Sequence, residues 1–173
     1  MKIVSMLSTV VMERPFNLEE ILNKLPDAEP LLHWVKLKFS PNNNHFSIYG
    51  SGKVSIYGTK SEEELFNLAN DFVLYLEEHE IYNEIQEIHV NNYVLTSHLG
   101  CKIDLNSIFP NLIDYNVVYE PEQFPGLRFK DRYGITYLVF GTGKIMIMGV
   151  KSLDNIEKYV AEFKELILEK SNI

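Results

Sequence analysis

Two short glycine-lysine strings have the clearest capacity for chemistry in this sequence. Gly50-Ser-Gly-Lys53 and Gly141-Thr-Gly-Lys144 could surround a phosphate group with backbone N–H groups and an ammonium group. A nucleotide-binding P-loop also needs a glycine five positions before its Gly-Lys pair and a Ser or Thr after the lysine. Here Val54 and Ile145 follow the lysines. The strings therefore predict glycine-containing hairpin turns rather than a nucleotide site.

The remaining polar residues do not form a catalytic pattern. Carboxylate pairs such as Glu77-Glu78 lie in an acidic run with helical spacing, which is typical of a solvated face. Cys101 has no metal-ligand spacing to any of the five histidines. The histidines are His33, His45, His79, His89 and His98. The sequence thus predicts no metal, no cofactor and a protein that is not an enzyme.

Composition indicates an ordered protein of the cell interior. The chain has 173 residues, 46% of them hydrophobic, which is enough for one substantial domain or two half-sized units. No apolar run reaches the roughly 18 residues that cross a bilayer, and Met1-Lys-Ile-Val-Ser5 does not resemble a secretory signal. A single cysteine fits a reducing cytoplasm. We therefore expect a cytoplasmic protein, associated with the nucleoid in a prokaryote or located in the nucleus in a eukaryote.

The chain contains an internal repeat. The segment Ile48–Ser61 recurs as Val139–Ser152, ninety-one residues later, with seven of fourteen positions identical. Nearer the start of each half, Leu18 matches Leu105 at an offset of eighty-seven. The repeat predicts a duplicated structural unit, and the change of offset predicts an insertion. The expected halves are 1–83 and 84–173, and the expected insertion is at 114–119.

Each half has the pattern of strand, helix, several antiparallel strands and a long helix. The short helix is expected to be capped by Asn17 in the first half and by Asp104 in the second. The long helix is expected to begin at Ser61, which forms a capping box with Glu64, and at Ser152. Alternating polarity predicts strands at Lys2–Val11, Leu32–Phe39, Asn44–Gly50, Lys53–Gly58, Glu87–Ser97, Gly126–Arg132, Ile135–Gly141 and Lys144–Gly149, with a turn at Ser40–Asn44.

Two strings in the second half resemble the TATA-box-binding protein family: Tyr119-Glu-Pro-Glu-Gln-Phe-Pro-Gly-Leu127 and Tyr137-Leu-Val-Phe-Gly-Thr-Gly-Lys144. The first half is similar to the family in its layout, in Ser51-Gly-Lys53 and in Gly58-Thr-Lys-Ser-Glu62. The resemblance implies an α+β fold. It would be a pseudo-two-fold saddle of two β-α-β-β-β-β-α-like repeats, with a curved antiparallel sheet and helices on its convex face.

The resemblance also implies residues that bind DNA in the minor groove. In this family, pairs of phenylalanines wedge between base steps. Phe124 and Phe140 match one complete pair, whereas in the first half Tyr49 matches the second member and Leu32 stands in place of the first. Apart from Asn92, whose amide can hydrogen-bond to minor-groove acceptors, the groove-floor positions are apolar in the second half and more polar in the first. They are Asn92, Val94, Leu138, Met146 and Met148 in the second half, with Ser5, Leu7, Ser47, Ser55 and Tyr57 as first-half counterparts.

Three matched pairs of lysines fall where the family contacts phosphates: Lys38 and Lys130, Lys53 and Lys144, Lys60 and Lys151. Acidic residues gather instead on or beside the first long helix. Because the two signs segregate, a net charge of −8 is compatible with a basic DNA-binding rim.

The family resemblance implies two binding partners. These are double-stranded AT-rich promoter DNA and transcription factor B, with RNA polymerase contacted indirectly. Glu120 and Glu122 match the loop by which the family docks transcription factor B. The expected function is that of a general initiation factor that bends promoter DNA. The polar first half leaves open a second hypothesis, a divergent paralogue that acts as a protein-interaction or regulatory module with weak or altered DNA binding.

Overall fold

A computed structural model describes residues 1–39 and 44–171. The element order is β-α-β-β-β-β-α, and it occurs twice. The chain divides into two compact units, Ser5–Asn91 and Met1–Val4 with Asn92–Ile173, which we call the first and second units. In the described residues, no helix is long and apolar enough to cross a membrane. The expected turn at Ser40–Asn44 lies almost entirely outside the described residues.

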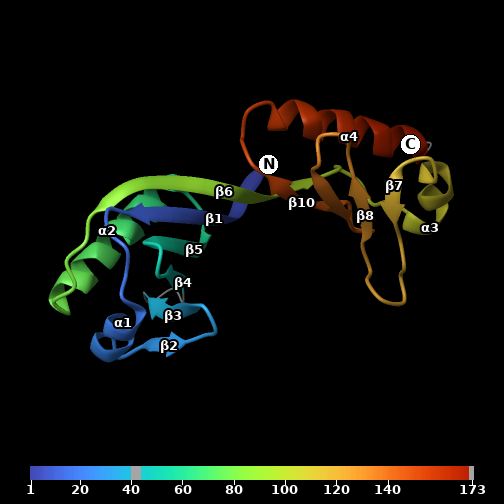
Figure 1. The fold of residues 1–173 in the computed structure, drawn as a ribbon. Helices are drawn as coiled ribbons and strands as arrows, with labels where there is room; N and C mark the ends of the chain where they lie inside the picture. The colour runs from blue at the N-terminus through green and yellow to red at the C-terminus, as the bar shows by residue number, and fades with distance from the viewer. Residues whose placement is uncertain (40–43, 172–173) are drawn as a thin grey trace. The chain divides into compact units, whose positions relative to one another are not determined.

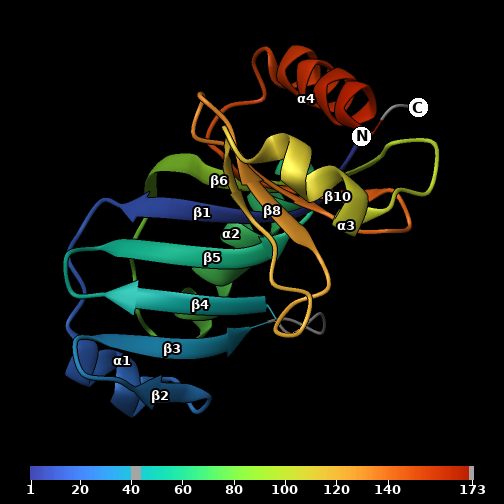
Figure 2. The same cartoon turned by 90° about the vertical axis from the view of Figure 1, so that its right-hand side faces the viewer.

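The first unit is a five-stranded antiparallel sheet with a long helix on one face. Its strands are hydrogen-bonded in the order β2-β3-β4-β5-β1, and Figure 2 shows α2 behind β1, β5 and β4. The elements are β1 (Lys2–Met12), α1 (Leu18–Lys24), β2 (Ala28–Pro30), β3 (Trp34–Phe39), β4 (Asn44–Tyr49), β5 (Lys53–Thr59) and α2 (Glu62–Glu78).

The second unit repeats this arrangement. Its strands are hydrogen-bonded in the order β6-β10-β9-β8-β7, and α4 runs along one side of them (Figure 1). The elements are β6 (Ile85–His98), α3 (Leu105–Ile108), the 3-10 helix η1 (Phe109–Leu112), β7 (Asn116–Val118), β8 (Leu127–Lys130), β9 (Thr136–Val139), β10 (Lys144–Val150) and α4 (Ile156–Lys170).

Aromatic side chains join each long helix to its sheet. In the first unit, the Phe46 ring meets Phe72 of α2 edge-on, at 5.0 Å between centroids. In the second, Tyr137 stacks on Phe163 of α4 at 3.9 Å, and Phe129 lies 5.1 Å from Phe163. Each unit therefore has its own buried core between helix and sheet.

Three helix starts were predicted correctly and one was wrong. The side chains of Asn17 and Asp104 accept backbone N–H groups at the starts of α1 and α3, and Ser61 accepts the N–H of Glu64. The second long helix does not begin at Ser152. Ser152 forms a local turn with Asp154, and α4 begins at Ile156. The position equivalent to Glu64 is Asn155, so α4 lacks the carboxylate that, at the start of α2, accepts the Lys60 N–H beside the Ser61 cap.

The predicted insertion is divided between two places. Val118 follows the cap residue Asp104 by fourteen positions, whereas the equivalent Glu29 follows Asn17 by twelve, so two added residues lie before Val118. Lys36 pairs with Glu29 across six intervening residues, whereas nine separate Arg128 from its partner Val118, so three more lie in the β7–β8 loop at 119–126. The predicted position at 114–119 therefore covers only part of the insertion. Figure 1 shows the β7–β8 loop extending away from α4.

Candidate nucleic-acid interface

Strand alternation gives each sheet a second face, turned away from α2 or α4, which we call the open face. In the second unit, Tyr93, Leu95, Tyr137 and Ile147 are buried on the helix side. Their neighbours along each strand must point the other way. The open face of the second unit therefore carries Asn92, Val94 and Thr96 from β6, Leu138 from β9, Met146 and Met148 from β10, and Arg128 and Lys130 from β8.

Strand register brings these side chains into rows. Thr96, Met146, Leu138, Arg128 and Val118 lie directly opposite one another in succession across β6, β10, β9, β8 and β7. Directly opposed residues on one face are close enough for their side chains to touch. The row, which we call the apolar strip, thus has three apolar side chains, the hydroxyl of Thr96 and one cation, Arg128.

The Phe124 and Phe140 rings lie together beside this strip. Their centroids are 5.8 Å apart and the rings meet at 65°, with Phe124 42% exposed. The backbone N–H groups of Gln123 and Phe124 both donate to the carbonyl of Glu120, which closes the turn that holds Phe124. The structure therefore brings the two predicted wedge residues together.

Gly126 provides the space for this ring pair. A Cβ added there would lie 2.7 Å from Phe124 Cε1 and 3.1 Å from Phe140 Cε1. Any larger residue would push at least one ring aside. A recess of about 420 Å³ adjoins the pair and is lined by Val118, Glu120, Gln123, Phe124, Gly126, Arg128, Leu138 and Met148.

The open face of the first unit has the same rows with different chemistry. The row equivalent to the apolar strip runs Thr9, Ser55, Ser47, Lys36, Glu29. Serines thus replace a leucine and a methionine, and a glutamate replaces a valine. In the next row, Leu7 lies opposite Tyr57, which lies opposite His45. The predicted polar character of the first half is therefore on the equivalent face, where Ser55 and Tyr57 are accessible but Ser47 is buried, at 3% exposure.

The first unit does not pair its predicted wedge residues. Leu32 lies before β3 and is 89% exposed. The ring nearest to Tyr49 belongs to Trp34, which lies directly opposite it with 6.1 Å between centroids.

The predicted phosphate-contacting lysines lie on or beside the open faces. Lys38 and Lys130 are in β3 and β8, Lys53 and Lys144 begin β5 and β10, and Lys60 and Lys151 follow β5 and β10; all six are exposed. The pairs are not equivalent in charge. The Lys38 ammonium lies 4.0 Å from Glu29, whereas Val118 takes the place of that acid near Lys130.

Sequence reasoning missed a fourth basic pair and the glycine that seats the rings. Lys36 and Arg128 occupy equivalent places in the central rows, and Thr9 and Thr96 occupy equivalent places at their ends. The offset of ninety-two that relates Lys38 to Lys130 also relates Lys36 to Arg128. Repeat spacing combined with strand alternation could therefore have found this pair.

The hairpin strings Gly50–Lys53 and Gly141–Lys144 have a structural role. Gly52 and Gly143 have φ angles of 90° and 88°. A Cβ on Gly52 would lie 2.8 Å from the Arg14 carbonyl oxygen. A Cβ on Gly143 would overlap the Cys101 carbonyl oxygen. The glycines thus allow close backbone approach. The described residues contain no cluster of His, Cys, Asp and Glu that could hold a metal.

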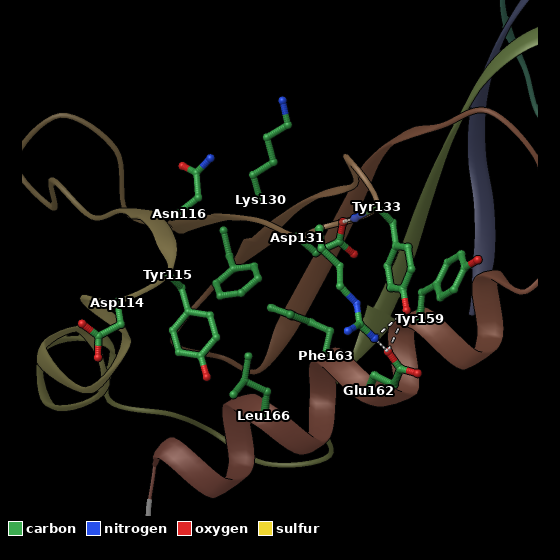
Figure 3. Close-up of a pocket in the computed structure, with 12 residues that line it drawn as sticks. Asp114, Tyr115, Asn116, Lys130, Asp131, Tyr133, Tyr159, Glu162, Phe163 and Leu166 are labelled. Atoms are coloured by element: carbon green, nitrogen blue, oxygen red, sulfur yellow. Dashed lines mark hydrogen bonds and ion pairs between the residues drawn. The ribbon is translucent and has the colours of Figure 1, made fainter.

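A separate pocket of about 530 Å³ lies between α4 and the β8–β9 turn (Figure 3). Arg132 donates to the Tyr133 hydroxyl and contacts Glu162 at 3.3 Å. Asp131 accepts the Tyr137 hydroxyl at 3.0 Å, and burial, followed by the charge of this carboxylate, raises the pKa of Tyr137. Of the predicted site residues, only Lys130 lines this pocket. Its lining side chains tie the turn to α4.

Comparison with known proteins identifies the family. The family described as transcription factor TFIID (or TATA-binding protein, TBP) matches residues 1–79 and 87–170. This chain belongs to that family. Its fold matches the solved structure of Methanococcus jannaschii TBP with a TM-score of 0.85 and 30% identity, over 97% of this chain and 98% of that one. Family membership confirms the predicted TATA-binding-protein fold and the prediction that the chain is not an enzyme.

Two archaeal relatives of this TATA-binding-protein family member show the extent of the similarity. The TATA-box-binding protein of Methanocaldococcus jannaschii is 31% identical over 173 residues, which cover 97% of this chain and 93% of that protein. The protein of Archaeoglobus fulgidus is 37% identical over 120 residues, which cover 68% of this chain and 66% of the relative. That match thus spans just under two thirds of the relative's length.

Proposed function

We propose that this protein is a transcription initiation factor that binds AT-rich promoter DNA through the minor groove and bends it. The observation that carries the proposal is the Phe124–Phe140 ring pair, seated over Gly126 at the edge of an apolar open face. Minor-groove proteins use such apolar wedges to unstack base steps. The six matched lysines, with Lys36 and Arg128, supply cations for phosphates on either side. The β7–β8 loop, with Glu120 and Glu122, recruits transcription factor B.

Titration with AT-rich duplexes at several salt concentrations tests this function. Each lysine that neutralises a phosphate contributes roughly one unit to the slope of log affinity against log salt. We expect Lys144→Ala to weaken binding and to lower that slope by about one unit. The matched control is Lys158→Ala, because Lys158 is exposed on α4. Equal slopes for both variants and the wild type would remove Lys144 from the interface.

The second unit should dominate affinity because its open face is the more apolar one. We expect triple alanine replacement of Asn92, Val94 and Leu138 to weaken binding by at least tenfold more, about 1.4 kcal/mol, than triple replacement of Ser5, Leu7 and Ser47. Fluorescence anisotropy of a labelled duplex measures both. Equal losses would show that the polarity difference between the faces has no energetic consequence.

A second candidate function rests on the polar first unit. Ser47, Ser55 and Tyr57 replace side chains that are apolar in the second unit. These replacements favour a paralogue in which the fold is kept for protein interaction. Failure to bind any AT-rich duplex at low salt, by a protein with an intact unfolding transition, would support this candidate.

A further inference from the structure

Position 34 marks a large difference in side-chain volume between the two units. Ile48 and Val139 are equivalent in the repeat. Ile48 pairs with Val35 and Val139 pairs with Leu127, so Val35 and Leu127 are also equivalent. The residue that precedes them is therefore Trp34 in one unit and Gly126 in the other.

This exchange changes which ring can occupy the end of the open face. In the second unit, the Phe124 ring from the β7–β8 loop lies over Gly126, in space that a side chain at that position would need. In the first unit, the Trp34 side chain starts from the equivalent backbone position. The β2–β3 connection is also three residues shorter than the β7–β8 loop. Leu32, the counterpart of Phe124, points into solvent and is 89% exposed.

A second ring pair nevertheless exists. Trp34 lies opposite Tyr49, the counterpart of Phe140, with 6.1 Å between centroids and 33° between planes. In the Phe124–Phe140 pair, the ring centroids are 5.8 Å apart and the ring planes meet at 65°. Trp34, Tyr49 and Phe140 are all partly exposed. Strand alternation places Trp34 on the face of Lys36 and Lys38, because Val35 and Leu37 are buried on the helix side.

We propose that Trp34, together with Tyr49, is the aromatic element by which the first unit contacts bases, and that Leu32 is not a wedge. The inference rests on the proposed DNA-binding function and names a residue of that same surface. An indole offers a wide face for stacking on an unstacked base, which a leucine lacks.

The chain contains one tryptophan, so Trp34 reports on its own environment. An AT-rich duplex is titrated into the full-length protein, with excitation at a wavelength that tyrosine does not absorb. Anisotropy of a labelled copy of the duplex gives binding independently. We expect tryptophan emission to be quenched with the same midpoint as the anisotropy change. Normal binding with unchanged emission would overturn the assignment of Trp34.

Variants separate stacking from mere proximity. We expect Trp34→Ala to lower affinity roughly tenfold, Trp34→Phe to keep most of it, and Leu32→Ala to match the wild type. Thermal unfolding monitors the fold. If Trp34→Ala does not fold, Leu32→Ala and the native emission still decide the question. If Leu32→Ala lowers DNA affinity and the wild-type Trp34 emission does not change on binding, Leu32 is the wedge residue. Absence of any anisotropy change in the wild type would refute the proposed function itself.

Discussion

Replacing Phe124 and Phe140 together by alanine should leave a folded protein that binds AT-rich DNA weakly and bends it little. Unstacking a base step costs a few kcal/mol, which the inserted rings and the surface gained by the bend must offset. The rings contact each other at the end of the open face, and Phe124 is 42% exposed. Their loss should therefore affect binding far more than folding. We expect a loss in affinity of about 1–3 kcal/mol per ring.

Energy transfer between fluorophores at the two ends of a duplex measures the bend. The matched control is Phe66→Ala, since Phe66 is a phenylalanine of similar exposure, 48%, on α2. This control should bind and bend DNA as the wild type does. A double variant that still bends DNA by the wild-type angle would rule out Phe124 and Phe140 as wedges.

Reversing two charges in the β7–β8 loop should abolish the complex with transcription factor B and DNA. Glu120 and Glu122 are both exposed, on a loop that extends away from α4 (Figure 1). Pro121 between them fixes one backbone angle of the loop. The two exposed carboxylates on this constrained loop can form ion pairs with basic residues of the partner. Arginines at the same positions would repel those basic residues. Binary DNA binding should be retained.

A gel-shift assay with purified transcription factor B tests the double variant Glu120→Arg, Glu122→Arg. The control is Glu77→Arg with Glu78→Arg, which makes the same change in net charge at exposed positions at the end of α2. This control separates a local contact from a general gain in affinity for DNA. A normal supershift from the loop variant would remove Glu120 and Glu122 from the partner surface.

Repeat spacing and polar alternation predicted most of the fold because the two units repeat the same local signals. The three-residue strands β2 and β7 have no periodicity of their own, and the residue-by-residue prediction omitted them. They form because β3 and β8 offer an unpaired edge. The start at Ser152 was wrong because a lone serine favours a turn as readily as a helix cap. Asn155 precedes α4 with φ 59°, a conformation no capping pattern indicates.

The candidate site was predicted unequally in its two parts. Phe124 and Phe140 belong to a continuous family-like string, and the structure brings them together. Leu32 was assigned because it stands in the place of the family's first wedge residue. That place in the sequence carries no information about side-chain volume at the following positions, so it could not show that Trp34 stands where the second unit has Gly126. Such an exchange becomes visible only when strand register is known.

The first-unit row that contains Ser47 and Ser55 has a consequence for the orientation of the protein on DNA. A·T and T·A pairs present nearly the same acceptors in the minor groove, so a duplex of such pairs looks alike from either end. A protein with two identical faces would sit on that duplex in either orientation with equal energy. Here the two rows differ: Thr9, Ser55 and Ser47 of the first unit are equivalent to Thr96, Met146 and Leu138 of the second. Under the proposed function, a guanine amino group in the minor groove would find a hydroxyl acceptor on Ser55 but a thioether on Met146. The position of a single G·C pair would then favour one orientation of the protein on the duplex.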